Sequence, residues 1–266
     1  MAHATTVSTS HFQPDVQYRS SSESHAPFDA LWIAAHPDDA ELTSGGTIAT
    51  MIREGKRIGI VDCTRGELGS RGTPDIRRDE AIAASKVLGI AERWNLGIPD
   101  GDVRIEQEYL IRVVMALRYF RPRILLFPPS FDRHIDHEDV HRLVRKAHFA
   151  SGLRNIRTEF EGKEQEPFRP ARMFAYMQTY TIPADVYVDT STTFDMKIAA
   201  MRAFATQFYT GTDHSADEPQ TFISRPEFVE FIEARARYFG ERIGVKYAEA
   251  YQSIEPLGLS SLSLLL

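Results

Sequence analysis

The chain has 266 residues, of which 42% are hydrophobic and 26% charged, a composition typical of a globular protein with one large or two small domains. The net charge of -6 provides no basic face, so we expect no nucleic-acid partner. The single cysteine, Cys63, excludes an internal disulfide framework and fits a cytoplasmic protein. No apolar run approaches the ~20 residues that a membrane span needs.

The two ends differ in composition from the rest of the chain. Residues 1–27 are rich in Ser, Thr and His and lack the apolar centre of a secretory signal, so we expect a disordered or loosely packed leader. Residues 257–266 contain only Leu, Ser and Gly and form an apolar tail. Between them, residues 28–256 predict a single domain.

Apolar runs alternate with helical patterns through the first 150 residues. The predicted strands are Leu31–Ala35, Arg57–Cys63, Arg93–Leu96 and Arg123–Phe127. The predicted helices between them are Gly45–Glu54, Asp75–Leu88 and Gln107–Phe120. This order is typical of an α/β fold, and we expect a Rossmann-like, mostly parallel sheet with helices on both faces.

The second part of the chain is less regular and predicts a C-terminal elaboration. Residues 151–170 are polar and predict a loop. Short strands are predicted at Met173–Thr179 and Val186–Val188, followed by helices at Phe194–Ala205 and Pro226–Phe239.

The first polar cluster, His36-Pro37-Asp38-Asp39, directly follows a predicted buried strand. Open α/β sheets bind their ligands at the carboxyl ends of strands, which makes His36 and Asp39 candidate metal ligands and Asp38 a candidate base. Pro-Asp-Asp is also ordinary turn chemistry, so the tetrapeptide alone does not decide between a turn and a site.

A second polar cluster follows the strand that ends at Phe127. It contains two histidines and two aspartates within six residues, in Asp132-Arg133-His134-Ile135-Asp136-His137. Because parallel strands end at the same edge of a sheet, both clusters are expected to face one crevice. The alternative interpretation is a helix cap, since Asp favours such positions.

Two other functions are compatible with parts of the sequence. His137-Glu138-Asp139-Val140-His141 matches the zinc-protease pattern, with Glu138 as the general base, but it leaves the first cluster unexplained. A non-catalytic sugar- or nucleotide-binding module is the other alternative, because Gly45-Gly46 at a helix start is compatible with phosphate binding.

The two clusters together resemble the LmbE-like, PIG-L family of zinc-dependent deacetylases over roughly residues 29 to 252. Besides the clusters, the resemblance rests on residues 45–47, 64–72, 77–81, 95–101, 233–240 and 244–250. Within that family the chain looks most like the N-acetylglucosaminyl-malate deacetylases of bacillithiol biosynthesis. The family usually has proline at the position of Ile135.

The resemblance implies a metal-dependent hydrolase that removes an acetyl group from an N-acetylglucosaminyl conjugate. It implies that His36, Asp39 and His137 hold Zn²⁺, with Fe²⁺ or Co²⁺ as alternatives, and leave a position open for the attacking water. Asp38 then acts as the base. Protonated His134, oriented by Asp136, stabilises the oxyanion.

The resemblance also implies substrate contacts and an assembly state. Arg77 matches a substrate-binding position and suits an anionic group such as a malate carboxylate. The other expected pocket residues are Arg65, Glu67, Asp102 and Tyr209. A small N-acetylated amino sugar is the expected ligand, and a homo-oligomer, trimer or hexamer, is the expected assembly.

Overall fold

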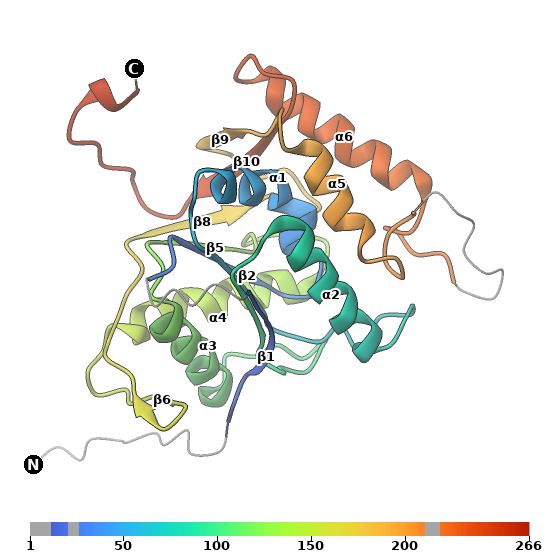
Figure 1. The fold of residues 1–266 in the computed structure, drawn as a ribbon. Coiled ribbons are helices and arrows are strands. Elements are labelled where there is room, and N and C mark those ends of the chain that lie inside the picture. Colours follow the sequence, from blue (N-terminus) through green and yellow to red (C-terminus); the bar gives the residue numbers. More distant parts are fainter. Residues whose placement is uncertain (1–11, 21–26, 211–218, 266) are drawn as a thin grey trace, which may run out of the picture.

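A computed structural model describes residues 12–20, 27–210 and 219–265 (Figure 1). Within them, one eight-stranded sheet has the order β1-β4-β3-β2-β5-β8-β10-β9. The strands are β1 (Asp15–Arg19), β2 (Ala30–Ala34), β3 (Ile58–Asp62), β4 (Glu92–Asn95), β5 (Ile124–Phe127), β8 (Arg172–Tyr176), β9 (Val186–Asp189) and β10 (Ala248–Ser253). The five strands from β4 to β8 are parallel, and β1, β10 and β9 are antiparallel to their neighbours.

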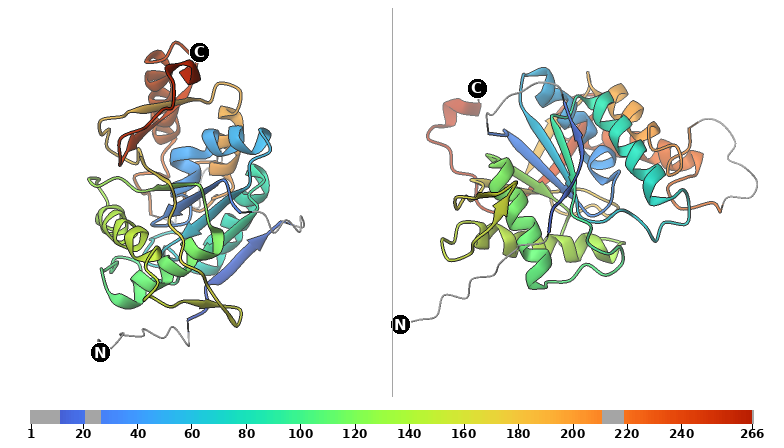
Figure 2. Two further views of the ribbon diagram at one scale, coloured as in Figure 1. Left: turned by 90° about the vertical axis from the view of Figure 1, so that its left-hand side faces the viewer. Right: turned by 60° about the horizontal axis from the view of Figure 1, so that its bottom comes forward.

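Helices cover both faces of this sheet (Figures 1 and 2). Helices α1 (Asp39–Arg53), α2 (Pro74–Leu88) and α5 (Phe194–Arg202) pack together on one face. Helices α3 (Gln107–Phe120) and α4 (Ile135–Ser151) pack on the other, and α6 (Pro226–Glu241) lies against β10 and β9. The mostly parallel α/β fold expected from the sequence is confirmed.

Strand β2 shows how the sequence builds two cores. All five of its residues are buried, as expected of a parallel strand with both faces covered. Leu31 and Ile33 pack with α3 and α4, whereas Trp32 packs with α1, α2 and α5. The side chains alternate because successive residues of a strand point to opposite faces.

The strand β1 lies in the segment expected to be a loosely packed leader. It pairs antiparallel with β4, and Arg19 of β1 forms an ion pair with Glu92 of β4 at 2.9 Å. A five-residue edge strand of mixed polarity carries a weak sequence signal, because its burial depends on a partner distant in the chain. The expectations for residues 1–11 and 21–26 lie outside the described residues.

Four further elements were absent from the sequence prediction. Helix α4 and strand β10 were missed, and a short hairpin of β6 (Glu159–Phe160) and β7 (Lys163–Glu164) interrupts the predicted loop. The apolar tail contains a short 3₁₀ helix, η1 (Leu262–Leu265). No helix in the described part of the chain is long and apolar enough to cross a membrane.

Helix α1 begins at Asp39, six residues before the predicted start, and therefore contains Gly45 and Gly46 in its interior. The Gly46 and Thr47 amides donate to the two carboxylate oxygens of Glu249, at 3.0 and 2.7 Å. A Cβ atom on Gly46 would lie 2.7 Å from Thr190. Close packing against β10 therefore accounts for this glycine, and its amide is not open to a phosphate group.

Candidate active site

The two polar clusters meet where the strand order reverses, between the neighbouring parallel strands β2 and β5. His36 follows β2, and His134 caps the helix that begins after β5. Both residues line a cavity of about 230 Å³, together with Asp38, Asp39, Arg77 and His137. The crevice expected from the sequence is therefore present.

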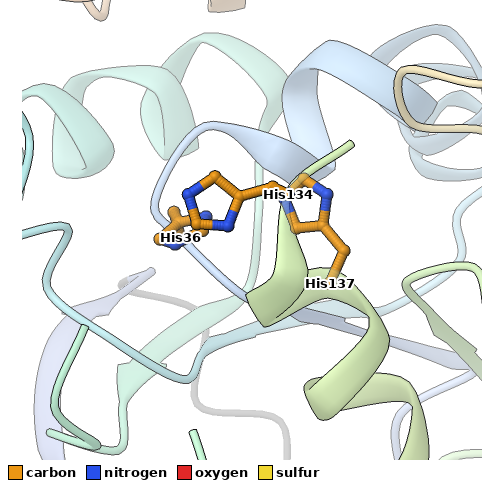
Figure 3. A group of neighbouring side chains, drawn as sticks. All are labelled: His36, His134 and His137. Atoms are coloured by element: carbon orange, nitrogen blue, oxygen red, sulfur yellow. The ribbon is translucent and has the colours of Figure 1, made fainter. Parts of the chain in front are cut away.

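Asp39 stands between two histidines. Its Oδ2 lies 3.6 Å from Nδ1 of His36, and its Oδ1 lies 3.4 Å from Nε2 of His137. Nitrogen atoms of His36, His134 and His137 also lie within 4.8 Å of one another. Figure 3 shows the three rings beside each other. The structure thus brings together the three predicted ligands and His134.

The remaining nitrogen of each candidate histidine ligand faces a carboxylate. Nδ1 of His137 lies 2.6 Å from Oδ2 of Asp132. Nε2 of His36 lies 3.1 Å from Asp100 and 3.3 Å from Asp136. Metal-binding histidines usually donate their second N–H to a carboxylate or carbonyl, which fixes the ring and increases its basicity. Two imidazoles oriented by carboxylates, together with the carboxylate of Asp39, form a ligand set that fits Zn²⁺.

The charges of the cluster favour a cation at its centre. Burial alone would raise the pKa of Asp39, but His137 and His36 hold that pKa well below its usual value. Burial opposes protonation of His137, yet Asp39 and Asp132 raise its pKa to about 9. The carboxylates thus outweigh the desolvation of the histidines, and a divalent cation would satisfy the same negative charges.

Asp38 is the buried carboxyl beside this cluster. Burial raises its pKa to about 7, against the opposing charge of Arg77. Nη1 of Arg77 donates to Oδ2 of Asp38 at 3.3 Å and to the carbonyl of Pro37 at 3.0 Å. The backbone of Asp38 has φ of 121°, a conformation that non-glycine residues rarely adopt and that often marks functional sites. A carboxyl group with this pKa can exchange protons near neutral pH.

Asp136 contacts both His36 and His134. Its carboxylate accepts from the Gly101 amide at 2.8 Å and faces His36, whereas only its backbone N–H reaches Nδ1 of His134. Burial and the nearby His36 and His137 lower the pKa of His134. A neutral His134 whose Nδ1 accepts a hydrogen bond carries its proton on Nε2.

The expected substrate residues divide into one that lines the cavity and four that do not. Arg77 lines the cavity. The Glu67 carboxylate accepts from the backbone amides of Arg65 and Asp100 and so shapes the loop, while Asp102 pairs with Arg104. The residues that do not line the cavity are Arg65, Glu67, Asp102 and Tyr209.

The protease alternative does not agree with the geometry. His137 and His141 both lie on α4, but Nδ1 of His141 bonds to the carbonyl of Pro128 at 2.9 Å, away from the cluster. The Glu138 carboxylate accepts from the Asp132 amide at 3.2 Å and pairs with Arg142. Neither His141 nor Glu138 lines the cavity.

The sequence prediction gave no individual role to Asp100, Asp132, Gln178 or Arg235, which line the cavity or contact its candidate ligands. Asp132 stands in the second polar cluster and Asp100 in the segment 95–101 that carries the resemblance, so their positions were visible although their partners were not. Gln178 and Arg235 lie far from either cluster in the sequence, and only the packing of β8 and α6 brings them to the cavity.

Comparisons with known proteins agree with this geometry. The family model described as PIG-L, GlcNAc-PI de-N-acetylase, matches residues 31–148, which contain both clusters. A conserved protein of Thermus thermophilus is 38% identical, with 88% of this chain and 98% of that one covered and a TM-score of 0.76. This chain belongs to the PIG-L family.

Two more distant relatives define the range of that similarity. The diacetylchitobiose deacetylase of Thermococcus kodakarensis is 25% identical, with 84% of this chain and 82% of the relative covered. The 4-carboxy-2-hydroxymuconate hydratase of Pseudomonas putida is 21% identical, with 88% and 99% covered and a TM-score of 0.70. The second likeness shows the fold alone, and since a hydratase shares it, the reaction has to be argued from the site.

Proposed function

We propose that this protein is a metal-dependent N-deacetylase that hydrolyses the acetamide of an N-acetylglucosaminyl conjugate. The observation that carries the proposal is the arrangement around Asp39, where two histidines face one carboxylate and each has a further carboxylate on its other nitrogen. The buried Asp38 beside them supplies the base that amide hydrolysis requires.

The metal would be held by His36, Asp39 and His137, with Zn²⁺ as the first candidate and Fe²⁺ or Co²⁺ as alternatives. When bound, such a metal activates water and polarises the carbonyl oxygen. A second group of donor atoms, from His36, Asp100 and Asp136, also lies within 4.8 Å. We assign these carboxylates to orienting His36, because Nδ1 of His36 faces Asp39.

The protein side chains divide the proton transfers between them. Asp38 takes the proton of the attacking water and returns it to the leaving amine, which a carboxyl with a pKa near 7 can do in both directions. Neutral His134 donates its Nε2 proton in a hydrogen bond to the oxyanion that develops on the carbonyl oxygen. Arg77 holds Asp38 in place through its hydrogen bond.

For the conjugate itself we propose GlcNAc-malate, the substrate of the bacillithiol branch that the motifs resemble. Arg77 and Arg133 line the cavity and can pair with malate carboxylates. Arg77 already contacts Asp38, which leaves Arg133, whose guanidinium lies 4.8 Å from the Phe222 ring, as the freer partner.

We also propose a trimeric or hexameric assembly, which light scattering on the purified protein tests.

Amine release from a panel of acetamido sugars tests the substrate. The panel contains GlcNAc-malate, diacetylchitobiose, a GlcNAc-inositol conjugate and free N-acetylglucosamine. The proposal predicts the highest kcat/KM for GlcNAc-malate, and Arg133→Ala should lower that value more than it lowers the value for the uncharged diacetylchitobiose. Preferential turnover of another conjugate would refute the malate assignment but retain the reaction, and no turnover of any acetamide would refute both.

A further inference from the structure

Gln178 contacts the candidate metal ligand Asp39 and lines the cavity. It follows β8 and is buried, with 4% of its surface exposed. Its Nε2 donates to Oδ1 of Asp39 at 2.5 Å, while Oδ2 of Asp39 accepts from the backbone amide of His36 at 2.9 Å. Both carboxylate oxygens are therefore held by donors, which fixes the plane of the carboxylate.

The other end of the same amide has no partner. Since Nε2 has to face the carboxylate, Oε1 points away from Asp39, and this buried oxygen accepts no hydrogen bond from any described residue. A buried acceptor left unpaired is costly, and such atoms in native structures call for an explanation. A hydrogen-bond donor on the molecule that occupies the cavity would supply the missing partner of Oε1.

We propose that Gln178 has two roles: its Nε2 positions Asp39, and its Oε1 accepts a hydrogen bond from the acetamide N–H of the substrate. The second role rests on the proposed function, because every substrate of that reaction carries an amide N–H. The Gln178 side chain thus positions both the substrate amide that is cleaved and the metal ligand Asp39.

Gln178 is itself held by the C-terminal part of the chain. Arg235 of α6 donates from Nη1 to the Gln178 carbonyl. The next two amides, of Thr179 and Tyr180, donate to Oδ1 of Asp132 at 2.8 and 3.0 Å. The segment 178–180 therefore contacts Asp39 directly and His137 through Asp132, and Arg235 fixes this segment to α6.

The positioning role is tested without turnover. The variant Gln178→Met keeps the side-chain volume and loses both polar atoms. Zn²⁺ affinity is measured on metal-free protein by competition with a chromophoric chelator, and we expect it to fall about 10- to 100-fold, as for other residues that orient metal ligands. Arg235→Lys should show a smaller loss. Arg237→Ala is the matched control, because Arg237 lies on the same helix, is exposed and pairs with Glu233 away from the cavity.

The acceptor role is tested on protein saturated with Zn²⁺. For GlcNAc-malate, Gln178→Met should raise KM about 2- to 10-fold, the range expected for one lost hydrogen bond, while Arg237→Ala leaves KM unchanged. Circular dichroism and the thermal midpoint establish that each variant is folded.

The two measurements test the two roles independently. Wild-type Zn²⁺ affinity in a folded Gln178→Met protein would overturn the positioning role, and an unchanged KM on metal-saturated protein would overturn the acceptor role. If Gln178→Met does not fold, the positioning role is tested with Arg235→Lys instead. A wild-type Zn²⁺ affinity in Arg235→Lys would equally overturn that role. A wild-type protein that turns over no acetamide removes the proposed function and the acceptor role together, whereas the metal titration still decides the positioning role.

Discussion

Nδ1 of His137 and Oδ2 of Asp132 lie 2.6 Å apart, and the same aspartate accepts the backbone amides of Thr179 and Tyr180. Asp132 therefore fixes both the orientation and the tautomer of His137, leaving Nε2 for the metal. Asp132→Asn should lower Zn²⁺ affinity about 10- to 100-fold, measured by chelator competition. An affinity within a factor of two of the wild type would contradict this role.

The two adjacent aspartates should behave differently when replaced. Asp38→Asn removes the base but no ligand, so the protein should keep its metal and lose about 10²- to 10⁴-fold in kcat. Asp39→Ala removes a ligand and should lose both metal and turnover. Metal content by atomic emission, measured beside kcat, separates the two. A metal-free Asp38→Asn protein would contradict the division.

The pH dependence of kcat/KM should reflect the ionisation of Asp38. The base has to be deprotonated to accept a proton, so the rate should fall as the pH falls through the pKa of Asp38, which burial raises to about 7. A bound divalent cation favours the carboxylate, which places this acid limb at or below about 7. Asp38→Asn should abolish the limb in the residual activity. If Asp38→Asn left the acid limb of the pH profile unchanged, that limb would reflect the ionisation of another group.

His141 provides a direct test against the protease pattern. Its imidazole bonds to the Pro128 carbonyl and packs on Phe127, outside the cavity. His141→Ala should therefore keep stoichiometric metal and retain deacetylase activity within about an order of magnitude, with some loss of stability from the buried ring. Loss of the metal from a folded His141→Ala protein would restore the protease interpretation.

A stability prediction concerns Arg93, which is fully buried beneath the site. Its guanidinium pairs with Asp62 at 2.7 Å and with Glu41 at 2.5 Å, and so ties β4 to β3 and α1. Arg93→Met would leave two carboxylates buried without their cation, and we expect a loss of about 3–5 kcal/mol in the free energy of unfolding. Urea denaturation measures it. The double variant with Asp62→Asn should recover part of the loss, and a neutral single variant would contradict this role of Arg93.

The parallel centre of the fold was predictable because its strands are short apolar runs bounded by turns, and α3 was predicted at its observed bounds. Strand β1 and helix α4 were not, since β1 depends on pairing with β4 and α4 begins with polar residues that were interpreted as a site loop. The start of α1 was misplaced because Gly45 and Gly46 resemble a helix terminus, although inside the helix the Gly46 amide donates to Glu249 and Gly45 packs beside Lys197.

The site shows the same division between local and distant information. His36, Asp38, Asp39 and His137 stand in compact motifs at strand ends, and the structure brings them together. The contact of the Asp136 carboxylate with His36 could not be predicted, because sequence proximity favours His134 whereas the helix start turns the carboxylate toward His36. The partners Gln178 and Arg235 depend on tertiary packing, which no local pattern records.

Removal and restoration of the metal tests the proposed metal-dependent reaction most directly. The purified protein, stripped with a chelator and dialysed, is assayed for amine release from GlcNAc-malate and diacetylchitobiose before and after addition of one equivalent of Zn²⁺, Fe²⁺ or Co²⁺. We expect no activity in the stripped protein, recovery with one metal ion per chain, and no recovery in Asp39→Ala. Full turnover by the stripped protein, or full recovery in Asp39→Ala, would contradict a reaction that depends on a metal held by Asp39.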